Sequence, residues 1–171
     1  MLFAPAAVFP DLILAIHILA VVIAFGATFA YPLFFSAARK LDPTVTPWLF
    51  RTLRMVSRRI INPGLLVVLL AGIYLASDEH RWGSFFVQWG IVAVIVIGAI
   101  EGGFMSPREG KLAELAERDL AATAVAAGGT RQSATWSPEF EATFKQLATG
   151  GIVLNVIVVI TVFLMATHAG A

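Results

Sequence analysis

Four long runs of apolar residues dominate the chain, and they are separated by three connections that are more polar. The runs cover approximately residues 12–35, 60–76, 85–104 and 150–167, and none shows the alternation of a half-buried strand. Each is long enough for an α-helix to cross a hydrocarbon core of about 30 Å at about 1.5 Å per residue. A spanning segment must also satisfy its own backbone hydrogen bonds in lipid. The pattern predicts an all-α, integral membrane four-helix bundle, a single domain over residues 1–171.

Composition agrees with a membrane protein, because 58% of the 171 residues are hydrophobic and only 13% are charged. A soluble domain of this length could not bury that much apolar surface. The chain has no cysteine, so a metal would need histidine, carboxylate or methionine ligands. The sequence contains no nucleophile elbow, phosphate-binding glycine loop or paired-carboxylate motif, which gives hydrolase and nucleotide chemistry no basis. We expect no nucleic-acid partner.

Basic residues are distributed unevenly between the connections. Of the twelve Lys and Arg residues, eleven lie in the first and third connections, and only Arg81 lies in the second. The positive-inside rule therefore places the first and third connections in the cytoplasm and both termini outside. The first run is followed, not preceded, by basic residues, so we expect it to be retained and not cleaved as a signal peptide. These features predict a multi-pass protein of the bacterial cytoplasmic (inner) membrane, with the lipid bilayer as its first partner.

The cytoplasmic connections contain start and stop signals for further helices. Apolar and basic residues after Trp48 recur at intervals of three and four, which predicts an interfacial amphipathic helix anchored by that tryptophan. Pro63 predicts a kink where the second span enters the bilayer. The sequence Ser106-Pro107-Arg108-Glu109 fits a capping box and predicts a cytoplasmic surface helix that stops at Gly128 and Gly129. Ser137-Pro138 predicts the start of the fourth helix.

His17 is the main candidate for a functional side chain inside an apolar run. It lies about 9 Å below the outer end of the first span. A polar group at that depth is costly and points to function, although a neutral imidazole also hydrogen-bonds between helices. Three interpretations stay open: structural packing, ligation of a haem or a metal, and proton relay. His80 and His168 are predicted on the same side, which makes an outer metal site a further hypothesis without a matching ligand motif. A bis-histidine haem is disfavoured because His17 and His168 differ in depth.

Glu101 lies near the inner end of the third span, at about the depth of Arg58 and Arg59. An ion pair is the simplest account, because an unpaired carboxylate there is expensive or protonated; a proton or substrate role is the alternative. Asn155 is expected to hydrogen-bond between helices. Glycines along the spans are expected to let the helices approach closely: Gly26, Gly72, Gly98, Gly102, Gly150 and Gly151.

Short apolar motifs across most of the chain are similar to those of known membrane families. They are Ala15-Ile16-His17-Ile18-Leu19 with Gly26 and Phe34, Pro63-Gly64, Leu70-Ala71-Gly72-Ile73-Tyr74-Leu75, Trp82-Gly83, Trp89, and Phe163-Leu164-Met165. The arrangement resembles small four-helix bacterial membrane proteins of a domain-of-unknown-function family. More distantly, it resembles copper-resistance-D-like and J-type protoporphyrinogen oxidase membrane proteins.

The resemblance implies a haem role for one residue. In the haem-linked oxidase relatives, the helix-one histidine is implicated in haem binding, and that role is carried onto His17, with haem b as the cofactor. Those relatives also have charged or histidine positions in later helices, where this chain has Gln88, Trp89 and aliphatic residues. Because these positions differ, the resemblance does not imply the oxidase activity for this chain.

Three functional hypotheses follow from the sequence. The first is a non-catalytic four-helix inner-membrane protein that serves as an accessory subunit beside other membrane subunits or in a homo-oligomer, or that binds a small ligand. The second is a haem-linked membrane oxidoreductase with His17 as axial ligand. The third is a small transporter in which Glu101 is the titrating group.

Overall fold

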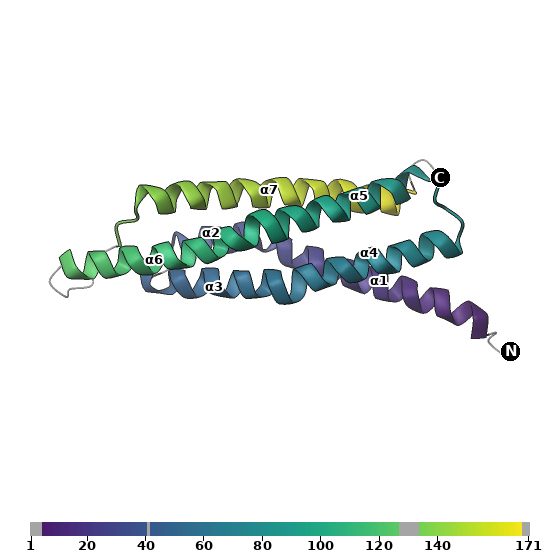
Figure 1. Cartoon of the computed structure of the whole chain (residues 1–171), viewed down its shortest axis with the longest axis horizontal. Coiled ribbons are helices and arrows are strands. Elements are labelled where there is room, and N and C mark those ends of the chain that lie inside the picture. The colour runs from purple at the N-terminus through teal and green to yellow at the C-terminus, as the bar shows by residue number, and fades with distance from the viewer. Residues whose placement is uncertain (1–4, 41, 127–133, 169–171) are drawn as a thin grey trace.

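The computed structural model describes residues 5–40, 42–126 and 134–168, and these residues are helical with short turns between the helices. The helices line up end to end as four rods (Figure 1). The first rod is α1 (Pro5–Phe29) followed by α2 (Tyr31–Ala38), and the fourth is α7 (Pro138–Ala166). The second contains a 3-10 turn η1 (Pro43–Val45), α3 (Thr46–Val56), a π-helical segment η2 (Ser57–Ile61) and α4 (Asn62–Asp78). The third contains α5 (Phe85–Ala99), a second π-helical segment η3 (Ile100–Met105) and α6 (Ser106–Ala126).

Each rod contains a stretch that is long and apolar enough to cross a membrane. Between 22% and 39% of the most apolar window of each rod is buried inside the described structure, so most of this apolar surface faces outward. Outward-facing side chains on all four rods include Leu12, Leu66, Val92 and Ile152. A monomeric soluble protein rarely exposes apolar surface on that scale, whereas lipid solvates it. The prediction of four helices that are long and apolar enough to cross a membrane is therefore confirmed.

The termini of the first and last rods lie at the same end of the molecule. The start of α1 and the end of α7 are both at the right of Figure 1, as four crossings require. Basic residues lie just after α2, on α3, η2 and α6, and in the first turns of α7, while Arg81 lies in the turn between α4 and α5. Arg131, Gly128 and Gly129 lie outside the described residues. The asymmetry of charge seen in the sequence is thus an asymmetry between the two ends of a long bundle.

Prolines account for the irregular segments of the rods. The first rod breaks at Ala30, two residues before Pro32, and the two π-helical segments end two residues before Pro63 and Pro107. A proline lacks the N–H that would bond the carbonyl four residues earlier, and its ring crowds that carbonyl. A π-helical turn widens the helix there without ending it. The predicted irregularity at Pro63 takes this form, and the same event recurs at Pro107, where no kink was predicted.

Two predictions for the basic connections between the apolar runs need correction. α3 is amphipathic, but it continues through η2 into α4 and lies along the bundle (Figure 1), so it is not an interfacial helix. Its apolar face packs on α6. Likewise, α6 continues from η3 without a new start, and neither carboxylate oxygen of Glu109 has a hydrogen-bond partner, so the capping box is not formed. The fourth helix does begin at Pro138, where the Ser137 hydroxyl accepts a hydrogen bond from the Phe140 N–H at 3.2 Å.

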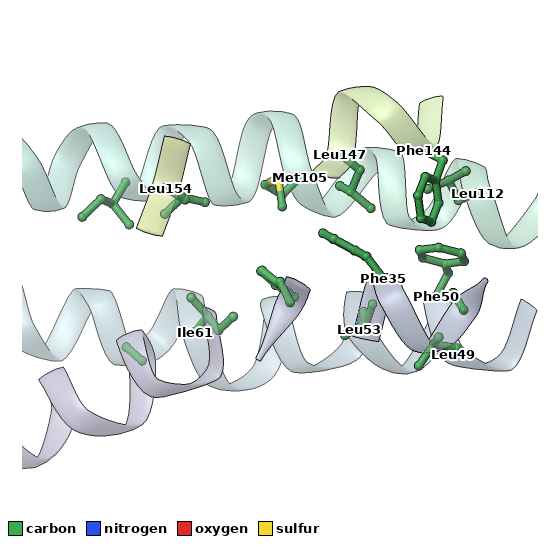
Figure 2. Packing of buried hydrophobic residues seen from close by; sticks show 14 of the residues in the cluster. Phe35, Leu49, Phe50, Leu53, Ile61, Met105, Leu112, Phe144, Leu147 and Leu154 are labelled. Carbon is green, nitrogen blue, oxygen red and sulfur yellow. The ribbon is translucent and has the colours of Figure 1, made fainter. Parts of the chain in front are cut away.

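Most of the main core lies in the half of the bundle that carries the basic residues. Figure 2 shows Phe35, Phe50 and Phe144 converging from three rods, with rings edge to face at 5.9 Å between Phe35 and Phe144 and 6.2 Å between Phe50 and Phe144. Edge-to-face rings add to the energy of their burial. Exposed ion pairs surround this core, among them Arg39 with Glu141 at 2.6 Å, and they contribute little beside it.

Replacement of Phe50 tests whether this core holds the basic half together. Phe50 is 0% exposed, so Phe50→Ala removes buried apolar contacts and should lower the free energy of unfolding by about 3–5 kcal/mol. Trp48→Ala on the same helix is the matched control, because Trp48 is 63% exposed and should give a much smaller change. Unfolding in mixed detergent micelles measures both, and equal losses would contradict the placement of the core.

Candidate functional site

A cavity of about 500 Å³ lies between α1, α4, α5 and α7, in the half of the bundle that carries the termini. Its wall is mostly aliphatic and aromatic, and it is partly open to the surroundings. The polar side chains that line it are His17, Thr161, Glu79, Arg81 and His168, and the last three belong to the ends of helices or to the turn after α4. A mostly apolar cavity of this volume with a few polar groups is typical of small-molecule sites.

His17 is held in one orientation at the wall of this cavity. Its Nδ1 lies 3.0 Å from the carbonyl oxygen of Val68 on α4. A carbonyl oxygen can only accept a hydrogen bond, so Nδ1 carries the proton and Nε2 of the neutral ring keeps its lone pair. Histidines that ligate metals commonly donate their second nitrogen to a carbonyl in this way. The lining side chain therefore offers one acceptor nitrogen in an apolar wall.

Two glycines, Gly72 and Gly90, leave room for the side chains that line the cavity. A Cβ at Gly72 would lie 3.2 Å from Cε1 of His17, so the absence of a side chain lets the imidazole approach α4. A Cβ at Gly90 would overlap the terminal methyl of Met165, which lies against the α5 backbone at the same cavity. By contrast, Gly26 and Gly98 have no atom within 4 Å of such a Cβ, so the expected close approach of helices does not occur at these two positions.

The three histidines of the sequence do not all lie at the cavity. His17 and His168 line the same cavity, and the His168 ring packs edge to face on Phe86 at 5.3 Å. His80 is exposed outside the cavity and bonds the carbonyl oxygen of Asp78 at 3.1 Å. Within residues 5–40, 42–126 and 134–168, no three His, Asp or Glu side chains come together as metal ligands. The outer metal hypothesis consequently gains no ligand set from this part of the chain.

A second polar cluster is buried near the opposite half of the bundle, beside the two π-helical segments. The hydroxyl of Tyr31 on α2 donates a hydrogen bond of 2.6 Å to Oε1 of Glu101 on η3. Tyr31 is 1% exposed, while Glu101, Glu109 on α6 and Ser57 on η2 are 0% exposed. Four rod segments thus place four polar side chains inside the core.

The expected ion pair of Glu101 with Arg58 or Arg59 is wrong. Both arginines are exposed, and the group that bonds Glu101 is the Tyr31 hydroxyl. The π-helical turns rotate the rods relative to a regular α-helix, which a depth estimate from residue number cannot include. Asn155 likewise has no hydrogen bond to its Oδ1 in the described structure, so the expected interhelical bond is not formed through that atom.

Glu109 was missed as a candidate because its position fits a capping box. Neither of its carboxylate oxygens has a hydrogen-bond partner among the described residues. Tyr31 and Glu101 act on it electrostatically, and so does Arg54 of α3, whose guanidinium lies against Gly110. The signal in the sequence was Pro107, because an irregular turn before it brings Glu109 to the inside of the bundle together with Glu101.

Comparison with known proteins adds no identification. Neither a protein-family model nor a curated protein nor a solved structure matches the chain. The functional argument therefore depends on the cavity and on the buried polar cluster themselves.

Substitution of Gly72 tests the orientation of His17. Gly72→Ala should push the imidazole away from the Val68 carbonyl, so the ring loses its fixed Nδ1–H form and becomes a mixture of tautomers. Nitrogen NMR of protein labelled in its histidines distinguishes the two ring nitrogens. Gly26→Ala on the helix of His17 is the control and should leave the spectrum unchanged, because that position is open. A wild-type ring protonated at Nε2 would contradict the assignment.

Proposed function

We propose that this protein is a non-catalytic, multi-pass protein of the bacterial inner membrane that binds a small lipid-soluble ligand in the outer half of its bundle. The supporting observation is the cavity of about 500 Å³ with the oriented His17 in its wall. In this proposal both termini and the cavity face outward, and the basic half lies in the cytoplasm.

The chemistry of the wall defines the kind of ligand. Aliphatic residues, Phe25 and Phe86 cover most of it, and the charged pair Glu79 and Arg81, 2.7 Å apart, lies at the turn after α4. An amphipathic molecule fits this arrangement, with its apolar body between the helices and its polar end at the turn. A hydroxyl or other donor on the ligand would meet the free Nε2 of His17, and lipid-facing rods allow entry from the bilayer.

Displacement of Met165 tests the ligand proposal. Gly90→Ala should push the Met165 methyl into the cavity and lower the amount of bound molecule several-fold. Gly98→Ala on the same helix introduces the same methyl group into open space and should retain the wild-type amount. Native mass spectrometry of the protein released from lipid nanodiscs, with organic extraction, measures the bound molecule. Wild-type protein without any bound small molecule would overturn the proposal.

Haem b is a second candidate ligand, supported by the bond from His17 to Val68. The residues fit a single axial ligand: His17 would hold the iron through Nε2, and its Nδ1–H bond would fix the ring. A bound haem would supply one-electron chemistry. A Soret band that His17→Ala abolishes would select this candidate, and colourless protein from haem-replete cells that still releases a lipid-soluble molecule would exclude it.

The proposed orientation is tested by labelling single cysteines in this cysteine-free chain. Asp78→Cys at the end of α4 should react with a membrane-impermeant maleimide in intact spheroplasts, because the positive-inside rule places that turn outside. Glu114→Cys on α6 should react only after permeabilisation. The reverse pattern would place the basic half and its core outside.

A further inference from the structure

The two buried glutamates lie on one rod and meet the same partners. Glu101 and Glu109 are both 0% exposed, and the rest of η3 and Pro107 lie between them in the chain. The Tyr31 hydroxyl bonds Glu101 at 2.6 Å and acts on Glu109 at longer range, while the two carboxyl groups act on one another. Oε2 of Glu101, both oxygens of Glu109 and the Ser57 hydroxyl have no hydrogen-bond partner in the described structure. These are buried polar atoms in one cluster, and each is costly without a proton or a partner.

The number of cations near Glu101 and Glu109 limits how many of the two carboxyl groups can be ionised. α2 contributes Tyr31, α3 contributes Arg54 and η2 contributes Ser57, and among the described residues Arg54 is the only cation that acts on the pair. The neighbouring bases point elsewhere: Arg58, Arg59 and Lys145 are exposed, and Arg108 bonds Gln146 at 3.1 Å.

One arginine compensates one carboxylate. A second ionised carboxylate in the core would leave a net charge of −1, which burial makes expensive. The cluster is neutral when one of the two carboxyl groups holds a proton.

We propose that Glu101 and Glu109 form a binding site for a single proton, which they share through the Tyr31 hydroxyl while Arg54 balances the remaining carboxylate. Uptake converts one carboxylate to a carboxylic acid, and the net charge of the cluster rises from −1 to 0. No other bond forms or breaks. This inference is independent of the ligand in the outer cavity, and it extends the transporter hypothesis from Glu101 alone to a pair.

Infrared difference spectroscopy of the protein in nanodiscs tests the site directly. A pH titration of wild-type protein should show the C=O band of one buried carboxylic acid per molecule, which disappears at alkaline pH. Glu101→Gln and Glu109→Gln should each abolish it, because the remaining carboxylate pairs with Arg54 and stays ionised. Glu114→Gln, which removes an exposed carboxyl group on the same helix as Glu109, should keep the band. Wild-type protein without the band, or a band that survives both single substitutions, would overturn the proposal.

Substitution of the arginine gives a second test that does not remove either carboxyl group. Arg54→Gln deletes the compensating charge, so both glutamates should be protonated and the band should grow about twofold. An unchanged band would contradict the charge balance.

Sodium provides a test of the ligand. Exchange of Na⁺ for N-methylglucamine at constant ionic strength should leave the wild-type titration unchanged. A band displaced by Na⁺ would assign the oxygens to a metal cation and overturn the proton site. Gly90→Ala, which alters only the outer cavity, should keep the band whether or not the protein binds a lipid-soluble ligand.

Discussion

The missing backbone N–H of proline is the constraint on which the arrangement of this protein depends. In a lipid-facing helix every carbonyl needs an internal partner, so a proline forces a local rearrangement of the helix before it. The second and third rods meet this demand with π-helical turns, which keep the rod continuous and change the direction of the side chains around it. Ser57 and Glu101 lie in these turns, and Glu109 follows the second one. Polar chemistry is buried where the backbone departs from regular geometry.

The two halves of the bundle differ in how tightly their helices pack against one another. In the basic half, aromatic side chains from three rods interlock and α6 covers the apolar face of α3, so this half has a core like that of a soluble protein (Figure 2). In the other half the helices turn most of their apolar side chains outward, and a cavity remains between them. Lipid contacts replace protein contacts there without loss of hydrophobic stabilisation. The aromatic core and the cavity thus lie toward opposite ends of the same rods.

Much of the fold was predictable, because apolar run length and charge asymmetry are properties of single segments. The four spans, the amphipathic pattern of α3 and the start of α7 at Pro138 follow from residues close together in sequence. The continuity of α5 with α6 did not follow, since a polar connection can continue a helix as well as interrupt it. His17 was identified from its depth alone, but its bond to Val68 and the space given by Gly72 depend on how α1 meets α4.

Glu109 shows why the inner cluster was harder to predict than His17. A glutamate three residues after a serine is a good helix start in a chain that leaves the membrane, and the local pattern supports that interpretation. The tertiary structure excludes this start, because the helix has already begun at Phe85, well before Ser106. Ser106 is itself buried inside the continuous helix. A capping role needs an exposed helix terminus with free N–H groups, and no terminus exists at Ser106. Once the cap is removed, the same carboxyl group is a buried acid beside a second one, and its chemistry changes from helix initiation to proton binding.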